Sequence, residues 1–231
     1  MKHNPKFIYP KSIRSLINDK RHYEIGTAKL PSVTTILSAT MPEEKRKSLD
    51  AWKQRVGATE AQKVVTTAAN RGTSLHSIVE GFLRGERHLD LTETGTIAHR
   101  MANVLIEKGL KNRVTDIWGI EPTVFYEKLY AGATDFIGIH DGIPIIGDHK
   151  NSNKPKKEIW LRDSYRLQVA AYALAFEDMF GEHISKGVNF IITPDCYYQE
   201  FSWDGEDFRQ AKYEWLRRVD QYYNQKQSLD K

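Results

Sequence analysis

Hydrophobic positions along this chain follow two different periods. Up to about residue 112 they recur every three to four residues, as in amphipathic helices; Ile97, Met101, Val104 and Leu105 are one example. From about residue 115 the pattern changes to short runs typical of β-strands, such as Thr123-Val-Phe-Tyr-Glu-Lys-Leu-Tyr130. The sequence therefore predicts a mainly helical first part and a strand-containing second part.

Individual elements can be predicted by residue range. Residues 1–30 are mixed in character and are expected to form an irregular arm. Thr40-Met-Pro-Glu43 has capping-box spacing with a proline in the first turn, so a helix is expected to start there. Further helices are predicted over 59–85, with a break at Gly72, and over 93–112. Three successive strands follow: one over 123–130 and the two arms of a hairpin. The remaining elements are a basic loop over 151–157, a helix over 161–180, strands over 188–193 and 197–203, and a helix over 205–227.

This order predicts one α/β domain with an N-terminal helical part. With 231 residues, of which 40% are hydrophobic, the chain is long enough to bury a core as a single domain. We expect an arm over 1–30 and one domain over 31–231, mainly helical in 31–114 and with an α/β core in 115–231.

The predicted hairpin carries the most informative polar residues. Asp141-Gly142 is a preferred two-residue turn, because both positions tolerate a positive φ. Such a turn would pair Asp135 with Asp148 on one face of the sheet, where two carboxylates repel each other. Lys150 returns to the same face by period-two alternation. A three-residue loop with a bulge would shift this register by one residue.

Two carboxylates held together beside an ammonium group indicate a divalent cation site. Carboxylate oxygens suit hard ions such as Mg²⁺ or Mn²⁺. Such an ion acidifies bound water and neutralises charge on a phosphoryl oxygen, and Lys150 would stabilise the transition state. The alternative interpretation is a surface hairpin whose charges are solvated.

Composition excludes several classes of protein. The single cysteine, Cys196, excludes disulfides within the chain and cysteine-ligated zinc or iron–sulfur sites. No run of 18 apolar residues is present, so no membrane span is expected, and the N-terminus lacks the apolar region of a secretory signal. The formal net charge is only +4, so nucleic-acid binding would have to depend on local clusters of basic residues.

Such clusters occur at 45–47, 53–55 and 150–166, and they include Lys154 and Arg166. Beside a two-carboxylate site they suggest contacts with a phosphate backbone, although solvated helix faces are the ordinary interpretation. Trp52, Tyr165 and Tyr197 could stack on unpaired bases or belong to the core. Two helical pairs share a face by four-residue spacing, Gln168 with Tyr172 and His76 with Glu80.

Taken together, these residues resemble a known family. Gly132-x-x-Asp135, Asp148-x-Lys150 and Gln168-x-x-x-Tyr172 resemble the PD-(D/E)xK nuclease superfamily in its RecB-like branch, and Gly72-x-x-x-His76-x-x-x-Glu80 resembles the upstream histidine motif of that branch. Further matching segments resemble the mitochondrial genome maintenance exonucleases and their short phage-encoded relatives; they are Pro31-Ser-Val-Thr-Thr-Ile-Leu37, Met41-Pro42, Trp52-Lys-Gln-Arg55, Lys154-Pro-Lys and Leu167-Gln-Val-Ala-Ala-Tyr172. The resemblance covers roughly residues 31–225.

The resemblance implies a fold, an activity and roles for residues. The fold would be a PD-(D/E)xK core, a central mixed β-sheet flanked by helices. The activity would be Mg²⁺-dependent hydrolysis of single-stranded DNA from a free end, with Mn²⁺ able to substitute and no iron–sulfur cluster. His76, Asp135, Asp148 and the His149 backbone carbonyl would hold the metal, and Lys150 would be the catalytic lysine. Supporting or DNA-contacting roles would fall to Gln168, Tyr172, Ser32, Thr34, Glu80, Glu121, Lys154 and Arg166.

Two other functions remain open from the sequence. One is a structure-specific or double-strand endonuclease on the same core, and the other is a non-catalytic nucleic-acid-binding accessory protein. We expect a monomer that binds single-stranded DNA, acts in replication, repair or recombination with the proteins of those processes, and has no membrane contact. Because no long presequence is seen, the cytoplasm of a bacterial or phage-infected cell is expected rather than the mitochondrion.

Overall fold

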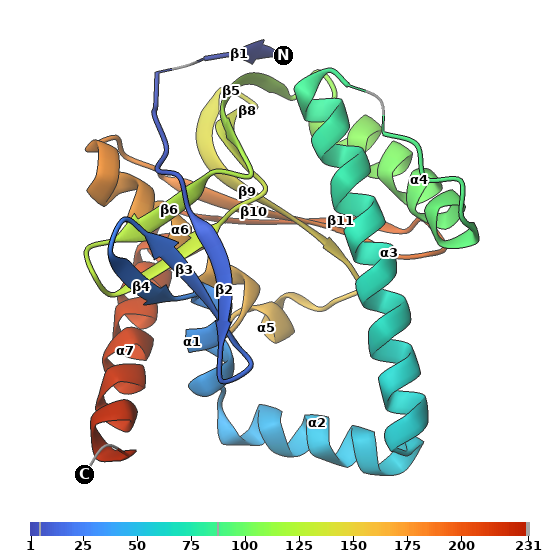
Figure 1. Ribbon diagram of the computed structural model, residues 1–231. Coiled ribbons are helices and arrows are strands. Elements are labelled where there is room, and N and C mark those ends of the chain that lie inside the picture. Colours follow the sequence, from blue (N-terminus) through green and yellow to red (C-terminus); the bar gives the residue numbers. More distant parts are fainter. Residues whose placement is uncertain (5, 87, 230–231) are drawn as a thin grey trace.

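A six-stranded mixed β-sheet forms the centre of the molecule (Figure 1). The computed structural model describes residues 1–4, 6–86 and 88–229, so residue 231, the predicted end of the domain, lies outside the described residues. The strands of the sheet, in spatial order, are β1 (Lys2–His3), β5 (Val114–Ile120), β8 (Phe136–His140), β9 (Ile143–Asn151), β10 (Lys186–Ile192) and β11 (Tyr198–Asp204). β1 pairs with β5 and β9 with β10 in parallel, and the other neighbours are antiparallel.

Helices cover both faces of this sheet. One core packs α3 (Ala58–Arg84) and α4 (Glu93–Leu105) against one face, and its buried side chains include Leu75, Met101, Phe136, Ile145 and Phe190. The other core packs α6 (Tyr165–Phe180) and α7 (Gly205–Leu229) against the opposite face, and it includes Ile137, Ile146, Val169, Phe176 and Trp215. The predicted fold class, a central mixed sheet flanked by helices, is confirmed.

The predicted hairpin is formed by β8 and β9. Asp141 and Gly142 occupy its turn with φ of 50° and 80°, as a two-residue turn of this kind requires. The turn pairs His140 with Ile143, and the ladder continues to the pair of Phe136 and Gly147. The expected register is therefore confirmed as far as the start of β8.

The prediction of an irregular arm over residues 1–30 was wrong. A three-stranded antiparallel sheet forms there from β2 (Ile13–Ile17), β3 (Lys20–Ile25) and β4 (Ala28–Pro31). Tyr23 and Leu30 of this sheet pack on Ala131. The four end residues of β2 are exposed and its middle residue is half-buried. Because neither face of this strand is buried, its sequence, Ile-Arg-Ser-Leu-Ile, shows no alternation of apolar and polar positions.

Helix α3 runs through Gly72 without the predicted break. A Cβ atom at residue 72 would lie 2.8 Å from Nδ2 of Asn151, so the glycine permits close approach of the helix to the end of β9. Arg71 fixes that approach, because its Nε donates to Oδ1 of Asn151 at 2.9 Å.

Three further predictions differ in detail. The helix over 93–112 is α4 followed by a π-helical turn, η1 (Ile106–Leu110). The strand over 123–130 is two paired strands, β6 (Thr123–Tyr126) and β7 (Tyr130–Ala133), with Glu127 at positive φ between them. The helix over 161–180 is α6 preceded by a short helix, α5 (Glu158–Leu161), and strand β5 was not predicted.

Helix α2 (Glu43–Val56) follows α1 (Val33–Ala39) and extends along one edge of the molecule to α3 (Figure 1). It contributes no buried residue to the described structure. Lys45 near its start lies 3.1 Å from a carboxylate oxygen of Asp163 and donates to the Trp160 carbonyl at 3.1 Å. Among the described helices, none is both long and apolar enough to cross a membrane.

Candidate active site

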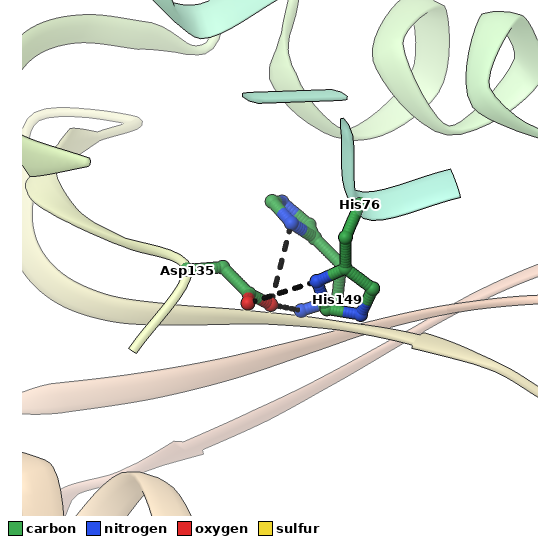
Figure 2. A group of neighbouring side chains, drawn as sticks. All are labelled: His76, Asp135 and His149. Carbon is green, nitrogen blue, oxygen red and sulfur yellow. Dashed lines mark hydrogen bonds and ion pairs between the residues drawn. The ribbon is translucent and has the colours of Figure 1, made fainter. Parts of the chain in front are cut away.

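Asp135 lies in the bend immediately before β8, outside the ladder. Its carboxylate accepts the backbone N–H of His149, and its oxygens lie 3.0 Å from Nδ1 of His76 and 3.4 Å from Nδ1 of His149 (Figure 2). The prediction of a directly opposed Asp135–Asp148 pair in the ladder was therefore wrong. Strand alternation holds only inside the ladder, and Asp135 has left it.

His76, Asp135 and His149 form a cluster able to hold a metal ion. One ligand atom from each lies within 4.8 Å of the other two. His76 comes from α3 and His149 from β9, so the cluster joins the helical part of the chain to the sheet. The His149 side chain, and not only its backbone carbonyl, is thus a candidate ligand. Two imidazoles and one carboxylate fit a divalent ion of the Mn²⁺ type better than Mg²⁺, which prefers oxygen ligands.

The protonation of the cluster follows from its charges and burial. The Asp135 carboxylate raises the pKa of His76 to about 9, so this imidazole would release a proton when a metal ion binds. Burial lowers the pKa of His149 to about 4, so that imidazole is neutral and offers a lone pair. Burial would raise the pKa of Asp135, but the charges of His76 and Lys150 hold it below its ordinary value. The cluster therefore contains an ionised carboxylate, as a cation site requires.

Asp148 and Lys150 point to the face of β9 opposite to His149. Asp148 is 2% exposed, and one of its oxygens accepts from Lys150 Nζ at 2.7 Å. The ammonium also lies 5.4 Å from the centre of the Tyr165 ring, on α6. Burial raises the pKa of Asp148, and burial would lower that of Lys150, but the carboxylates of Asp148 and Asp135 raise it instead. Lys150 thus keeps its positive charge beside the cluster.

Asn189 is a site residue that sequence reasoning missed. This side chain is fully buried on β10, where it pairs with Asp148 across the parallel strands. Its Nδ2 donates to the second oxygen of Asp148 at 3.0 Å, and its Oδ1 accepts from Trp203 Nε1 at 2.8 Å. A polar residue within the apolar run Val188–Ile192 was the available signal, because a buried strand tolerates an amide only when it is hydrogen-bonded.

Gln168 and Tyr172 do share one face of α6, as predicted. Both are buried, and Nε2 of Gln168 donates to the Tyr172 hydroxyl at 3.0 Å. Packing accounts for the glycine of the motif Gly132-x-x-Asp135, because a Cβ atom at residue 132 would lie 2.6 Å from the Tyr172 ring. The pair supports the sheet beneath the site.

Of the two further acidic candidates, Glu121 is the one drawn into the site. Glu121 has a positive φ of 50°, and its backbone N–H donates to the Asp135 carbonyl at 2.9 Å. Burial, followed by the charge of Asp135, raises its pKa to about 7. Glu80 instead accepts from Arg84 at 2.9 Å along the surface of α3.

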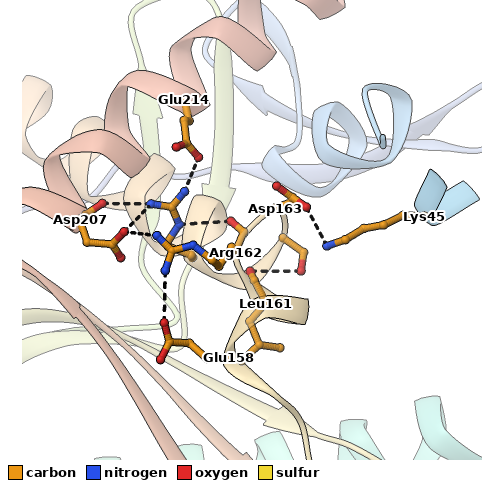
Figure 3. A network of polar contacts seen from close by, with 9 residues as sticks. Lys45, Glu158, Leu161, Arg162, Asp163, Asp207 and Glu214 are labelled. Carbon is orange, nitrogen blue, oxygen red and sulfur yellow. Dashed lines mark hydrogen bonds and ion pairs between the residues drawn. The ribbon is translucent and has the colours of Figure 1, made fainter. Parts of the chain in front are cut away.

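Two predicted DNA contacts require correction. Ser32 is 2% exposed and caps α1, since its hydroxyl accepts the Thr35 N–H at 3.0 Å. Arg166 is equally buried and binds Asp207 at 3.1 Å and also Glu214, both on α7; these two carboxylates belong to the network in Figure 3. Both residues therefore hold the fold together. A basic or hydroxyl residue in a favourable motif gives no information about the direction of its side chain.

A groove of about 1000 Å³ leads to the Lys150 side of the site. We call it the α2 groove, because α1 and α2 form one wall and the segment from α5 to α6 forms the other. Its floor includes Tyr165, which contacts Lys150, and Gln168. Thr34 lines this groove, whereas Lys154 is on the exposed loop after β9 and does not. The basic and aromatic residues along the groove are Lys45, Arg55, Lys156, Arg218, Trp52, Trp160 and Tyr165.

Comparison with known proteins gives a consistent result. No family model matches the chain. It is 28% identical over 214 residues to "Mitochondrial genome maintenance exonuclease 1" of Mus musculus, which covers 87% of this chain and 61% of that protein. It is 26% identical over 225 residues to the protein of the same name from Xenopus tropicalis, which covers 92% of this chain and 62% of that one. The chain thus spans about three fifths of the length of these curated relatives.

Among solved structures, the fold is similar to that of "Putative exonuclease" from Eubacterium rectale. The TM-score is 0.50 at 16% identity, and the match covers 69% of this chain and 65% of that one. At this identity the likeness concerns the fold alone. The sequence relatives confirm the resemblance that the motifs predicted: over most of its length, this chain resembles the mitochondrial genome maintenance exonucleases.

Proposed function

We propose that this protein is a divalent-metal-dependent exonuclease that hydrolyses phosphodiester bonds of single-stranded DNA from a free end. The observation that carries the proposal is the convergence of the His76–Asp135–His149 cluster, the Asp148–Lys150 pair and the α2 groove. The names of the relatives in sequence, which are genome maintenance exonucleases, support the same activity. Replication, repair or recombination of DNA is the corresponding process.

Each part of the site has a chemical role in this proposal. His76, Asp135 and His149 would hold the divalent ion, and Asp148, on the other face of β9, would act through Lys150. A bound ion would neutralise negative charge on the phosphate and lower the pKa of a bound water molecule. Lys150 keeps its ammonium beside the scissile phosphate and stabilises the negative charge of the transition state. Asp148 orients that ammonium at 2.7 Å, and Asn189 fixes the orientation of Asp148.

The α2 groove supports single strands as the substrate. Its aromatic side chains, Trp52, Trp160 and Tyr165, offer faces on which unpaired bases stack. Its cations, among them Arg55 and Lys156, match a phosphate backbone. An exposed stacking surface of this kind is accessible to bases only when they are unpaired.

The attachment of α2 at both ends supports the requirement for a free end. Lys45 ties its start to Asp163, and the helix continues into α3, which Arg71 ties to β9. A strand lying between α2 and the core would therefore have to enter endwise. The test is digestion of a linear single strand and of the same sequence closed into a circle, both in Mg²⁺ or Mn²⁺. We expect the linear strand to disappear and the circle to persist; cleavage of the circle would identify an endonuclease, and binding without any cleavage would identify an accessory protein.

Asn189 provides a second prediction. Replacing it with leucine removes the hydrogen bond to Asp148, and loss of such a supporting contact typically costs about 10- to 100-fold in activity. Asn189→Leu should therefore lower kcat by that factor while single-strand affinity stays unchanged. Trp203→Phe is the matched control, since it removes only the Trp203 hydrogen bond and leaves the one to Asp148. Equal kcat values for Asn189→Leu and the wild type would refute the role of Asn189.

A further inference from the structure

The β2–β3 hairpin presents large apolar side chains to solvent. Leu16 is 71% exposed, Ile13 67% and Ile17 38%. β2 is also the outer strand of its sheet, with β3 as its neighbour. Exposed apolar residues on an outer strand usually mark a contact surface, because natural proteins otherwise protect such edges.

The tip of this hairpin lies at the far end of the DNA path proposed above. A cavity of about 560 Å³ separates the tip from α1, and we call it the tip cavity. Leu16 and Arg21 line it from the hairpin, Thr34 and Ser38 from α1, and Arg46 from α2. Since Thr34 and Ser38 also line the α2 groove, the tip cavity continues that groove across α1.

The charges around the hairpin are those of a nucleic-acid contact. Between Lys11 and Arg21 the chain carries four basic residues and one acidic residue, Asp19. Arg46 adds a further positive charge from the opposite wall of the tip cavity. A phosphate backbone matches this surface in charge, whereas a strand from a partner protein would be selected mainly by the unpaired backbone of β2.

The hairpin is also held rigidly. Asn18 and Asp19 form a two-residue turn with φ of 51° and 59°. The carbonyl of Arg21 accepts hydrogen bonds from the Ser32 N–H at 3.0 Å and from the Thr35 hydroxyl at 2.8 Å, which tie the hairpin to the start of α1. The exposed apolar tip is therefore a fixed projection beside the groove.

We propose that the β2–β3 hairpin separates the two strands of DNA where a single strand joins a duplex. This inference rests on the proposed exonuclease function. Leu16 and Ile17 would pack against the last base pair, as apolar wedges do in proteins that unstack DNA. The basic residues around them would hold the phosphates of the departing strand, and the other strand would continue into the α2 groove.

The test compares single-stranded and paired nucleotides in one substrate. A duplex closed at one end by a loop carries a single-stranded tail, 5′ in one version and 3′ in another, with a label in the loop. We measure the digestion rate in the tail and in the paired region for the wild type and for the double variant Leu16→Ser, Ile17→Ser. The variant should digest the tail at the wild-type rate and the paired region about tenfold more slowly, a loss of about 1.4 kcal/mol. The control is Leu91→Ser, an equally apolar residue that is 90% exposed between α3 and α4.

Each result is decisive. A tenfold fall in the ratio of paired to single-stranded rate, absent in Leu91→Ser, supports strand separation. An unchanged ratio, including an equal fall in both rates, overturns the proposal of strand separation. A wild-type protein that stops at the first base pair also overturns it. If the wild type leaves the tail itself intact, the proposed exonuclease function fails instead. The unchanged tail rate also shows that the variant is folded.

Discussion

Lys150→Ala should lower the cleavage rate of a single strand by about 10²- to 10³-fold, the cost of removing one electrostatic contact to a transition state. The ammonium lies 2.7 Å from Asp148, and the carboxylates of Asp148 and Asp135 keep it charged despite its burial. Its loss leaves the α2 groove intact, so affinity for single-stranded DNA should change little. End-labelled digestion under single-turnover conditions gives the rate, and fluorescence anisotropy in Ca²⁺ gives the affinity.

The matched control is Lys154→Ala. Lys154 lies four residues further along the same chain segment but is exposed on the loop and does not line the groove. This variant should cleave at nearly the wild-type rate. If Lys150→Ala cleaved as fast as Lys154→Ala, Lys150 would have no part in the chemistry.

Asp135→Asn should weaken Mn²⁺ binding by about 100-fold or more, because it removes the charged ligand of the cluster; losing even a supporting contact costs about 10- to 100-fold. Calorimetric titration of the metal-free protein with Mn²⁺ measures this directly, and removal of the metal with a chelator should stop cleavage by the wild type. Asp141→Asn is the control, because it makes the same change in the same hairpin but outside the cluster. The Asp141 carboxylate lies in the turn and pairs with Arg113. Wild-type Mn²⁺ affinity in Asp135→Asn would remove this cluster from consideration as the metal site.

Asp148→Asn completes this experiment. An equal loss of Mn²⁺ affinity in Asp135→Asn and Asp148→Asn would mean that both carboxylates hold one ion, as the sequence predicts. A loss in Asp135→Asn alone would assign the ion to His76, Asp135 and His149, the three residues whose ligand atoms already lie within 4.8 Å.

The sequence predicted the hairpin well because a turn is a local feature. Asp141-Gly142 sets a two-residue turn, and the turn fixes the register of every following pair. The prediction for Asp135 failed at the point where the chain leaves the ladder, since alternation no longer determines direction there. His149 shows the complementary case, because alternation placed its side chain on the face away from Asp148, and only the fold brings Asp135 and His76 to that face.

The remaining site residues depend on contacts between distant parts of the chain. Asn189 meets Asp148 across 41 positions in sequence, and Arg166 meets Asp207 across the same separation. Nothing in the spacing near either residue indicates which partner it finds. The β2–β3 hairpin was missed for another reason: its outer strand is largely exposed, so burial left no pattern in its sequence.

The length of α3 connects two parts of the protein that would otherwise be separate. The helix begins at Ala58, where α2 ends, and carries His76 eighteen residues later, a distance of about 27 Å along its axis. Gly72 lets this helix rest against Asn151, one turn before His76. A helix is stiff over this length, so a displacement of α2 would be transmitted along α3 to that contact. The position of the His76 imidazole is therefore mechanically linked to that of α2, so a strand bound in the α2 groove would act on a residue that would hold the metal.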